Sequence, residues 1–256
     1  MITFHRRSTT LLLLAFLVLW LSSCAGPKPV PGPPEVVSVY DYAGVPTGMR
    51  QGLYHSVAPG ETIWRIAKMY EVDAETIKEV NRISDVRELD IGHRLYIPDA
   101  AARRHVITLY PSRKWKYIII HHSATDFGSS EEFNKAHLKR GWQGIGYHFV
   151  IDNGTCGKGN GQIETSPRWT KQMSGAHCKA SGMNNNGIGI CLVGNFSEDP
   201  VSSRQMNSLV YLTNTLRKTY KIPKRNIIRH GKVRGANTEC PGKRFPWRTF
   251  WSRLGR

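Results

Sequence analysis

The sequence lacks an apolar run long enough to cross a bilayer. Its longest uninterrupted run, residues 11–21, is much shorter than the roughly 20 apolar residues that a transmembrane helix requires. Glycine and proline, at 24 and 14 of 256 residues, are too few for a collagen-like chain and indicate linkers and turns. With 40% hydrophobic residues, the chain can bury one good core, or a small module's core beside that of a medium domain.

Acidic residues are scarce in one part of the chain only. Residues 100–256 contain 26 Lys and Arg against 8 Asp and Glu, a net charge of +18, whereas residues 54–98 contain 6 against 8, a net charge of −2. Such a positive field favours an anionic partner, which could be nucleic acid, a lipid surface or an acidic cell-wall polymer. The sequence lacks interleaved basic and aromatic motifs, so we expect no nucleic-acid partner.

The N-terminus has the features of an export signal. Two arginines precede the apolar run, and Leu-Ser-Ser-Cys at residues 21–24 closes it, so we expect residues 1–23 to be a signal peptide. The closing residues resemble a bacterial lipobox, which implies a lipid on Cys24 that anchors the exported protein to a membrane. Residues 24–53 would then form a Pro-rich tether. Ala25 implies sorting to the outer membrane, facing the periplasm. The alternative is an ordinary signal peptide with an unrelated cysteine.

Export places the cysteines in an oxidising compartment. Cys156, Cys178 and Cys191 could therefore include one disulfide, which leaves at least one of the three unpaired within the chain. The sequence does not determine which two would pair.

Residues 54–98 have the pattern of a small self-contained module. A strand is expected at 54–58, followed by a helix with apolar residues at helical spacing. Asp73 is suited to cap a second helix, and a closing strand is expected at 94–97. This order of elements predicts a compact βααβ unit.

Two segments of this module, residues 57–64 (Val-Ala-Pro-Gly-Glu-Thr-Ile-Trp) and 91–98 (Ile-Gly-His-Arg-Leu-Tyr-Ile-Pro), resemble the LysM domain. The resemblance implies binding to the N-acetylglucosamine-containing glycan of peptidoglycan or chitin, with Gly60, Thr62 and Ile63 at the groove. For Ile63 a purely structural place in the core is the alternative. The sequence contains no second copy of the module, so we expect weak binding.

Residues 99–114 are expected to form a basic, solvated linker, and from residue 115 the pattern becomes mixed α/β. Strands are expected at 117–120, 145–151, 188–193 and 226–230, and helices at 129–140, 201–220 and 245–254. Phe133 and Leu138 should face inward from the first of these helices. The alternation predicts an α/β domain over residues 115–256, with a central mixed β-sheet flanked by helices.

Two of these strands end in histidine, and a cysteine follows the second. His121 closes an Ile-Ile-Ile run, His230 follows Ile-Ile-Arg, and Cys240 comes ten residues later. Strand ends can converge at one edge of a sheet, and two imidazoles with one thiolate leave the open fourth position that a catalytic zinc ion needs. Imidazole and thiolate are softer donors than calcium or magnesium prefers, so we expect one Zn²⁺ per chain.

Five segments in order resemble the type 2 N-acetylmuramoyl-L-alanine amidases, a family shared with peptidoglycan recognition proteins and phage lysozyme-like amidases. They lie at residues 118–125, 146–149, 175–177, 186–194 and 238–242. The resemblance covers roughly residues 115–245 and implies a zinc hydrolase that cleaves the amide bond between N-acetylmuramic acid and L-alanine. Peptidoglycan, both glycan strand and stem peptide, would be the partner, and we expect a monomer.

The resemblance also implies roles for residues around the metal. Tyr147 matches the family tyrosine that holds and helps to activate the water. His177 matches a histidine of the substrate site, although a structural loop histidine is the alternative. Thr238 stands where phage members carry lysine and active peptidoglycan recognition proteins carry threonine, so a hydroxyl would face the oxyanion. Lys232 or Arg234 could supply the missing positive charge.

Three other functions remain as alternatives. A peptidoglycan-binding protein without activity would keep the fold, but such relatives lose the Cys ligand that is present here as Cys240. A zinc peptidase that acts within the stem peptide is disfavoured by the order of the motifs. A nucleic-acid binder is suggested only by the basic charge.

Overall fold

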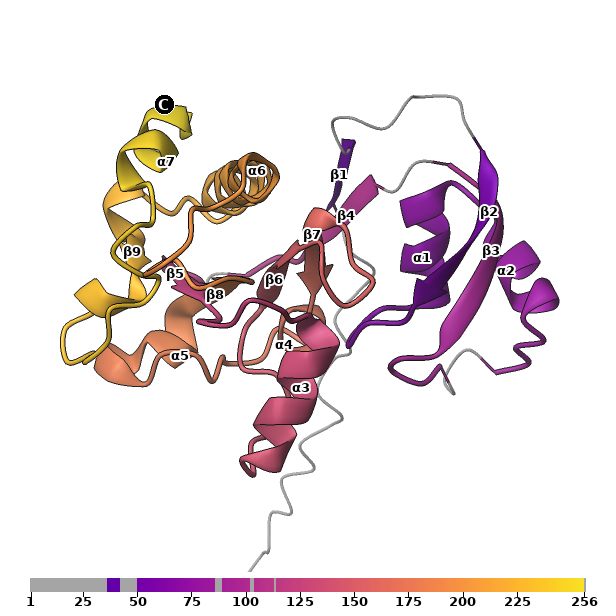
Figure 1. Ribbon diagram of the computed structural model, residues 1–256, viewed down its shortest axis with the longest axis horizontal. Coiled ribbons are helices and arrows are strands. Elements are labelled where there is room, and N and C mark those ends of the chain that lie inside the picture. The colour runs from indigo at the N-terminus through magenta and orange to yellow at the C-terminus, as the bar shows by residue number, and fades with distance from the viewer. Residues whose placement is uncertain (1–35, 42–49, 86–88, 102–103, 113, 256) are drawn as a thin grey trace, which may run out of the picture. The chain divides into compact units, whose positions relative to one another are not determined.

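The computed structural model describes residues 36–41, 50–85, 89–101, 104–112 and 114–255 (Figure 1). The predicted signal peptide and the predicted lipidation of Cys24 lie outside these ranges. Within the described part of the chain, no helix is both long enough and apolar enough to span a membrane.

The small module has the predicted βααβ order. It comprises β2 (Gln51–Ser56), α1 (Ile63–Tyr70), α2 (Ala74–Val80) and β3 (Arg94–Ala100), with β2 and β3 paired antiparallel. Asp73 caps α2 as expected, because its carboxylate accepts the backbone N–H groups of Glu75 and Thr76. The fully buried side chains of Ile66, Ile77 and Leu95 belong to the core of this module.

Residues 99–114 are not the solvated linker that their basic residues suggested. They contain the end of β3 and a further strand, β4 (Arg104–Leu109), which pairs antiparallel with β1 (Val36–Asp41). Val106, Ile107 and Leu109 of β4 are buried. The apolar run Val-Ile-Thr-Leu makes up the second part of this strand, which begins at Arg104. The expected tether likewise contains β1.

The second domain contains the predicted mixed sheet, in the order β7-β6-β8-β5-β9. Its strands are β5 (Tyr117–His122), β6 (Phe149–Asn153), β7 (Asn160–Thr165), β8 (Gly187–Leu192) and β9 (Ile227–Arg229). β6, β8, β5 and β9 are mutually parallel, and β7 is antiparallel to β6. Because β5 lies between β8 and β9, the carboxyl ends of all three strands meet at one edge of the sheet.

Helices cover both faces of this sheet (Figure 1). The helices are α3 (Ser130–Lys139), α4 (Pro167–Thr170), α5 (Met183–Asn186), α6 (Ser203–Thr219) and α7 (Trp247–Arg253), with 3-10 turns η2 (Ala180–Gly182), η3 (Lys224–Asn226) and η4 (His230–Lys232). The longest helix, α6, begins at a capping box in which the Ser202 hydroxyl accepts the N–H of Gln205 and the Gln205 side chain accepts the N–H of Ser202.

Alternation along β5 decides which side chains reach each face. Ile118 and Ile120 pack into the large core that includes the apolar side of α6. Ile119 packs on the opposite face with Met183 of α5. Since successive residues of a strand point to opposite faces, His121 lies on the Ile119 face and His122 on the other.

One core prediction is wrong. Leu138 of α3 is 52% exposed and does not face inward. The buried side chain on this part of the helix is its neighbour His137, whose Nδ1 accepts the backbone N–H of Gly146 at 3.0 Å. The hydrogen bond from the Gly146 N–H therefore explains why His137, and not Leu138, is the buried residue.

Candidate metal centre

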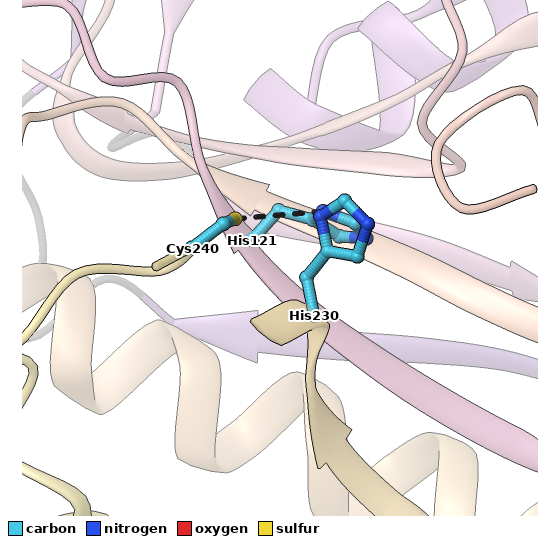
Figure 2. Close-up of side chains that lie close together, drawn as sticks. All are labelled: His121, His230 and Cys240. Atoms are coloured by element: carbon cyan, nitrogen blue, oxygen red, sulfur yellow. Dashed lines mark hydrogen bonds between the residues drawn. The ribbon is translucent and has the colours of Figure 1, made fainter. Parts of the chain in front are cut away.

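The three predicted metal ligands lie together at the carboxyl edge of the sheet. His121 is near the end of β5, His230 begins η4 directly after β9, and Cys240 lies in the loop that leads to α7. Figure 2 shows that their side chains point toward one another. One ligand atom from each residue lies within 4.8 Å of the others, and Cys240 Sγ is 3.7 Å from His121 Nδ1.

This spacing fits a tetrahedral zinc ion. Zn–N and Zn–S bonds of about 2.1 and 2.3 Å place the two ligand atoms about 3.6 Å apart, close to the distance found between Cys240 and His121. Imidazole and thiolate are donors that zinc accepts readily. The residues present therefore fit this metal.

Burial controls the protonation of the ligands. It lowers the pKa of His121 well below 6.5, with the neighbouring His177 and His230 adding to the effect, and it lowers the pKa of His230. Both imidazoles are therefore neutral, as metal ligation requires. Burial raises the pKa of the Cys240 thiol to about 12, although the backbone N–H of His122 donates to its sulfur at 3.4 Å. A cation at this position would stabilise the thiolate form.

Tyr147 lies beside the first ligand. Its ring centroid is 5.3 Å from that of His121, and its hydroxyl is hydrogen-bonded to the thiol of Cys191. Cys191 is the register partner of His121 in the neighbouring strand β8. Burial, followed by the neighbouring Cys191 and Cys240, raises the pKa of Tyr147 well above 10, so the hydroxyl stays protonated and can donate a hydrogen bond.

His177 and Thr238, the other two predicted site residues of this domain, have different surroundings. The His177 ring is only 9% exposed and contacts His121, with ring centroids 5.0 Å apart. Burial lowers its pKa to about 3. Thr238 is exposed, and its hydroxyl accepts the backbone N–H of Cys240 at 3.1 Å. Lys232 and Arg234 are exposed on the same loop.

A cavity of about 560 Å³ opens beside His177 and His230. Among its lining residues are some that the sequence did not single out: Trp142, Arg168, Lys179 and Asn184. Arg168 donates hydrogen bonds to the carbonyl oxygens of Ile145 and Ser174, both at 2.6 Å. Its guanidinium therefore connects two segments of backbone beside the cavity. Trp142 is 41% exposed. The sequence did not indicate Trp142 or Arg168 as site residues, because neither lies in a motif at the end of a strand. Only the folded chain brings them to the cavity.

The predicted glycan-binding residues of the small module are unequally accessible. Ile63 is 4% exposed and belongs to the module's core, the alternative left open for it. Thr62 is exposed, and its hydroxyl caps α1 by accepting the N–H of Arg65. Gly60 is half-buried. Of these three residues, Gly60 and Thr62 therefore offer surface to a ligand.

Among the residues that the structure describes, the three cysteines other than Cys240 form no disulfide. Cys156 is exposed, Cys178 and Cys191 are buried, and all three are free thiols.

Fold and site together define a mixed α/β protein with a His-His-Cys cluster that can hold a zinc ion. The family model of N-acetylmuramoyl-L-alanine amidases matches residues 111–243, and the LysM domain model matches residues 55–98. The chain belongs to this amidase family, with a LysM domain ahead of the amidase domain.

Known relatives cover the same region. The endolysin of Enterobacteria phage K11 is 34% identical over 132 residues, which are 48% of this chain and 77% of that protein. Peptidoglycan-recognition protein SC2 of Drosophila simulans is 29% identical over 135 residues, 49% of this chain and 67% of that protein. Among solved structures, the N-acetylmuramoyl-L-alanine amidase LysC of Clostridium intestinale is similar, with 34% identity, a TM-score of 0.47, and coverage of 56% of this chain and 88% of that one.

Proposed function

We propose that this protein is a zinc-dependent amidase that hydrolyses the bond between N-acetylmuramic acid and the L-alanine of the peptidoglycan stem peptide. The observation that carries the proposal is the cluster itself: ligand atoms of His121, His230 and Cys240 lie within 4.8 Å of one another, and the Tyr147 ring lies beside that of His121. Membership of the amidase family and the similarity to phage endolysins support the same reaction.

The roles of the residues follow from their protonation. A zinc ion held by the three ligands would supply an activated water and a polarised scissile carbonyl. Tyr147, kept protonated by burial, orients the attacking water and donates a hydrogen bond as negative charge develops on the carbonyl oxygen. Thr238 lies two residues before Cys240, and its hydroxyl can still donate while it accepts the Cys240 N–H.

The presence of Cys240 favours an enzyme over a protein that only binds peptidoglycan. Without the thiolate the site would offer two neutral imidazoles, a weaker set for a divalent cation. The 3.7 Å distance between Cys240 Sγ and His121 Nδ1 supports a role for Cys240 as the third ligand.

Mass spectrometry of digested sacculi tests the reaction. Zinc-loaded protein should release stem peptides that begin with L-alanine and leave muramic acid without peptide. Cys240→Ser should lower this release by more than about 100-fold, beyond the roughly 10–100-fold that loss of a ligand's hydrogen-bond partner costs. Cys156→Ser, at an exposed free thiol, is the matched control and should act like wild type. Products that retain alanine on muramic acid would indicate a peptidase, and binding without any release would indicate a recognition protein.

The LysM domain and the N-terminus suggest where the reaction takes place. We propose that the LysM domain holds the enzyme on glycan and that a lipid on Cys24 anchors it to the outer membrane, facing the periplasm. The support for the anchor is the Leu-Ser-Ser-Cys sequence after the apolar run. Membrane fractionation of Cys24→Ala against wild type tests it: the variant should leave the outer-membrane fraction, and an unchanged distribution would refute the anchor.

A further inference from the structure

His177 has both ring nitrogens committed to partners inside the protein. Its Nδ1 lies 3.1 Å from His121 Nε2, and its Nε2 lies 3.2 Å from the carbonyl oxygen of Gly187. The ring is 9% exposed although it borders the cavity beside the metal centre. A residue whose only function was to contact substrate would keep a nitrogen free for it.

The directions of these two hydrogen bonds follow from one fixed partner. The Gly187 carbonyl can only accept, so His177 Nε2 must carry a proton. In the neutral ring Nδ1 is then bare and accepts, which requires His121 Nε2 to donate. His121 in turn carries its proton on Nε2 and leaves Nδ1 bare, and Nδ1 is the atom that lies 3.7 Å from Cys240 Sγ. The chain of bonds therefore selects the tautomer of His121 that can bind a metal through Nδ1.

Two glycines hold the His177 ring in this place. A β-carbon on Gly189 would lie 2.4 Å from His177 Cδ2, and one on Gly175 would lie 2.3 Å from the same atom. The ring therefore packs directly on backbone, with no space for a side chain at either position. Packing this close leaves the ring little freedom on the side of these two glycines.

We propose that His177 is a positioning residue for the metal ligand His121: it accepts the Nε2–H of His121 and so directs Nδ1 toward the metal. This inference rests on the proposed zinc site. Partners of this kind fix the orientation and tautomer of ligand histidines, and their loss typically weakens metal binding by 10–100-fold.

Zinc affinity of the full-length protein, measured by competition with a chromophoric chelator, tests the proposal. Asn and Leu have similar shapes, but only Asn carries an acceptor near the position of His177 Nδ1. His177→Leu should weaken zinc binding by roughly 10–100-fold, and His177→Asn should stay within about fivefold of wild type. Equal affinities for wild type and His177→Leu would overturn the inference, as would equally weak binding by the two variants. If wild type bound no zinc, the proposed function would fail instead.

A measurement on wild type keeps the test independent of any variant's folding. Nitrogen-15 NMR of the zinc-loaded protein should find His121 and His177 both protonated at Nε2 and not at Nδ1. A proton on Nδ1 of either ring would refute the chain of bonds. Kinetics at saturating zinc add a further distinction, because a purely substrate-contacting His177 would raise KM in the Leu variant and leave zinc affinity unchanged.

Discussion

Substitution of Gly189 by alanine should damage both stability and metal binding. Gly189 lies in β8, opposite Ile119 of β5. The new methyl carbon would lie 2.4 Å from Cδ2 and 2.6 Å from Cγ of His177, whereas ordinary contact begins near 3.4 Å. The imidazole must therefore retreat by about 1 Å, and its 3.1 Å contact with His121 opens to about 4 Å, beyond hydrogen-bond range.

The expected magnitude combines two effects. Overpacking of a well-filled interior costs about 1–3 kcal/mol, and loss of the hydrogen bond costs about 1 kcal/mol more. We therefore expect Gly189→Ala to lower the free energy of unfolding of the metal-free protein by about 2–4 kcal/mol. The displaced His177 should also weaken zinc binding by about 10-fold or more.

Urea unfolding and chelator competition measure these two effects. Gly159→Ala is the matched control, because its β-carbon would meet only Gln162 at 3.9 Å and the change removes the same chain flexibility. The reasoning is refuted if Gly189→Ala unfolds within about 0.5 kcal/mol of Gly159→Ala and binds zinc like wild type, since the ring would then have room to spare.

Three further predictions concern other parts of the domain. Tyr147→Phe should lower kcat by roughly 10²–10⁴-fold with zinc affinity unchanged, and a wild-type kcat would remove the tyrosine from the mechanism. Burial lowers the pKa of His148 well below 6.5. As the pH falls below 6.5, the unfolded chain therefore binds a proton that the folded protein does not, and the free energy of unfolding decreases. Between about pH 7.5 and 5.5, the free energy of unfolding of wild type should fall by about 1.4 kcal/mol more than that of His148→Gln, and parallel curves for the two proteins would contradict this. Ser202→Ala removes the N-cap of α6 and should lower the free energy of unfolding, measured by thermal unfolding, by about 1 kcal/mol. Ser203→Ala, at the exposed next position, should change it by almost nothing, and equal losses in the two variants would disprove the capping role.

The sequence predicts the two histidine ligands because each follows an apolar run that forms a strand of the sheet. Three isoleucines before His121 form a run that is typical of a buried strand, and β5 extends through the histidine. The strand also explains why the first histidine of the pair faces the site: His121 shares a face with Ile119, while the His122 ring lies near Phe196, with ring centroids 6.1 Å apart. Period-two alternation is therefore enough to choose between the two histidines once the position of one apolar neighbour is known.

Polar strands are the part of the fold that sequence patterns miss. β7 reads Asn-Gly-Gln-Ile-Glu-Thr, which has the composition of a loop, yet Gln162 and Glu164 are each 1% exposed. Tertiary partners explain the difference, since Glu164 accepts the N–H of Ser130 and forms an ion pair with Lys158 at 3.1 Å. Those partners lie 34 and 6 residues away, so no local pattern contains them.

The role of His177 shows the same limit inside the site. Its motif identifies the residue, and resemblance implies a contact with substrate, but its hydrogen bonds depend on Gly187 in β8 and on His121, 56 residues earlier. Whether the ring can reach His121 depends in turn on the absence of side chains at Gly175 and Gly189. Short sequence motifs identify the residues that can bind the metal. The tautomer of a ligand histidine, in contrast, depends on how distant segments pack together. Glycines that line a metal site should therefore be counted with its ligands when the binding strength of a relative is predicted from sequence.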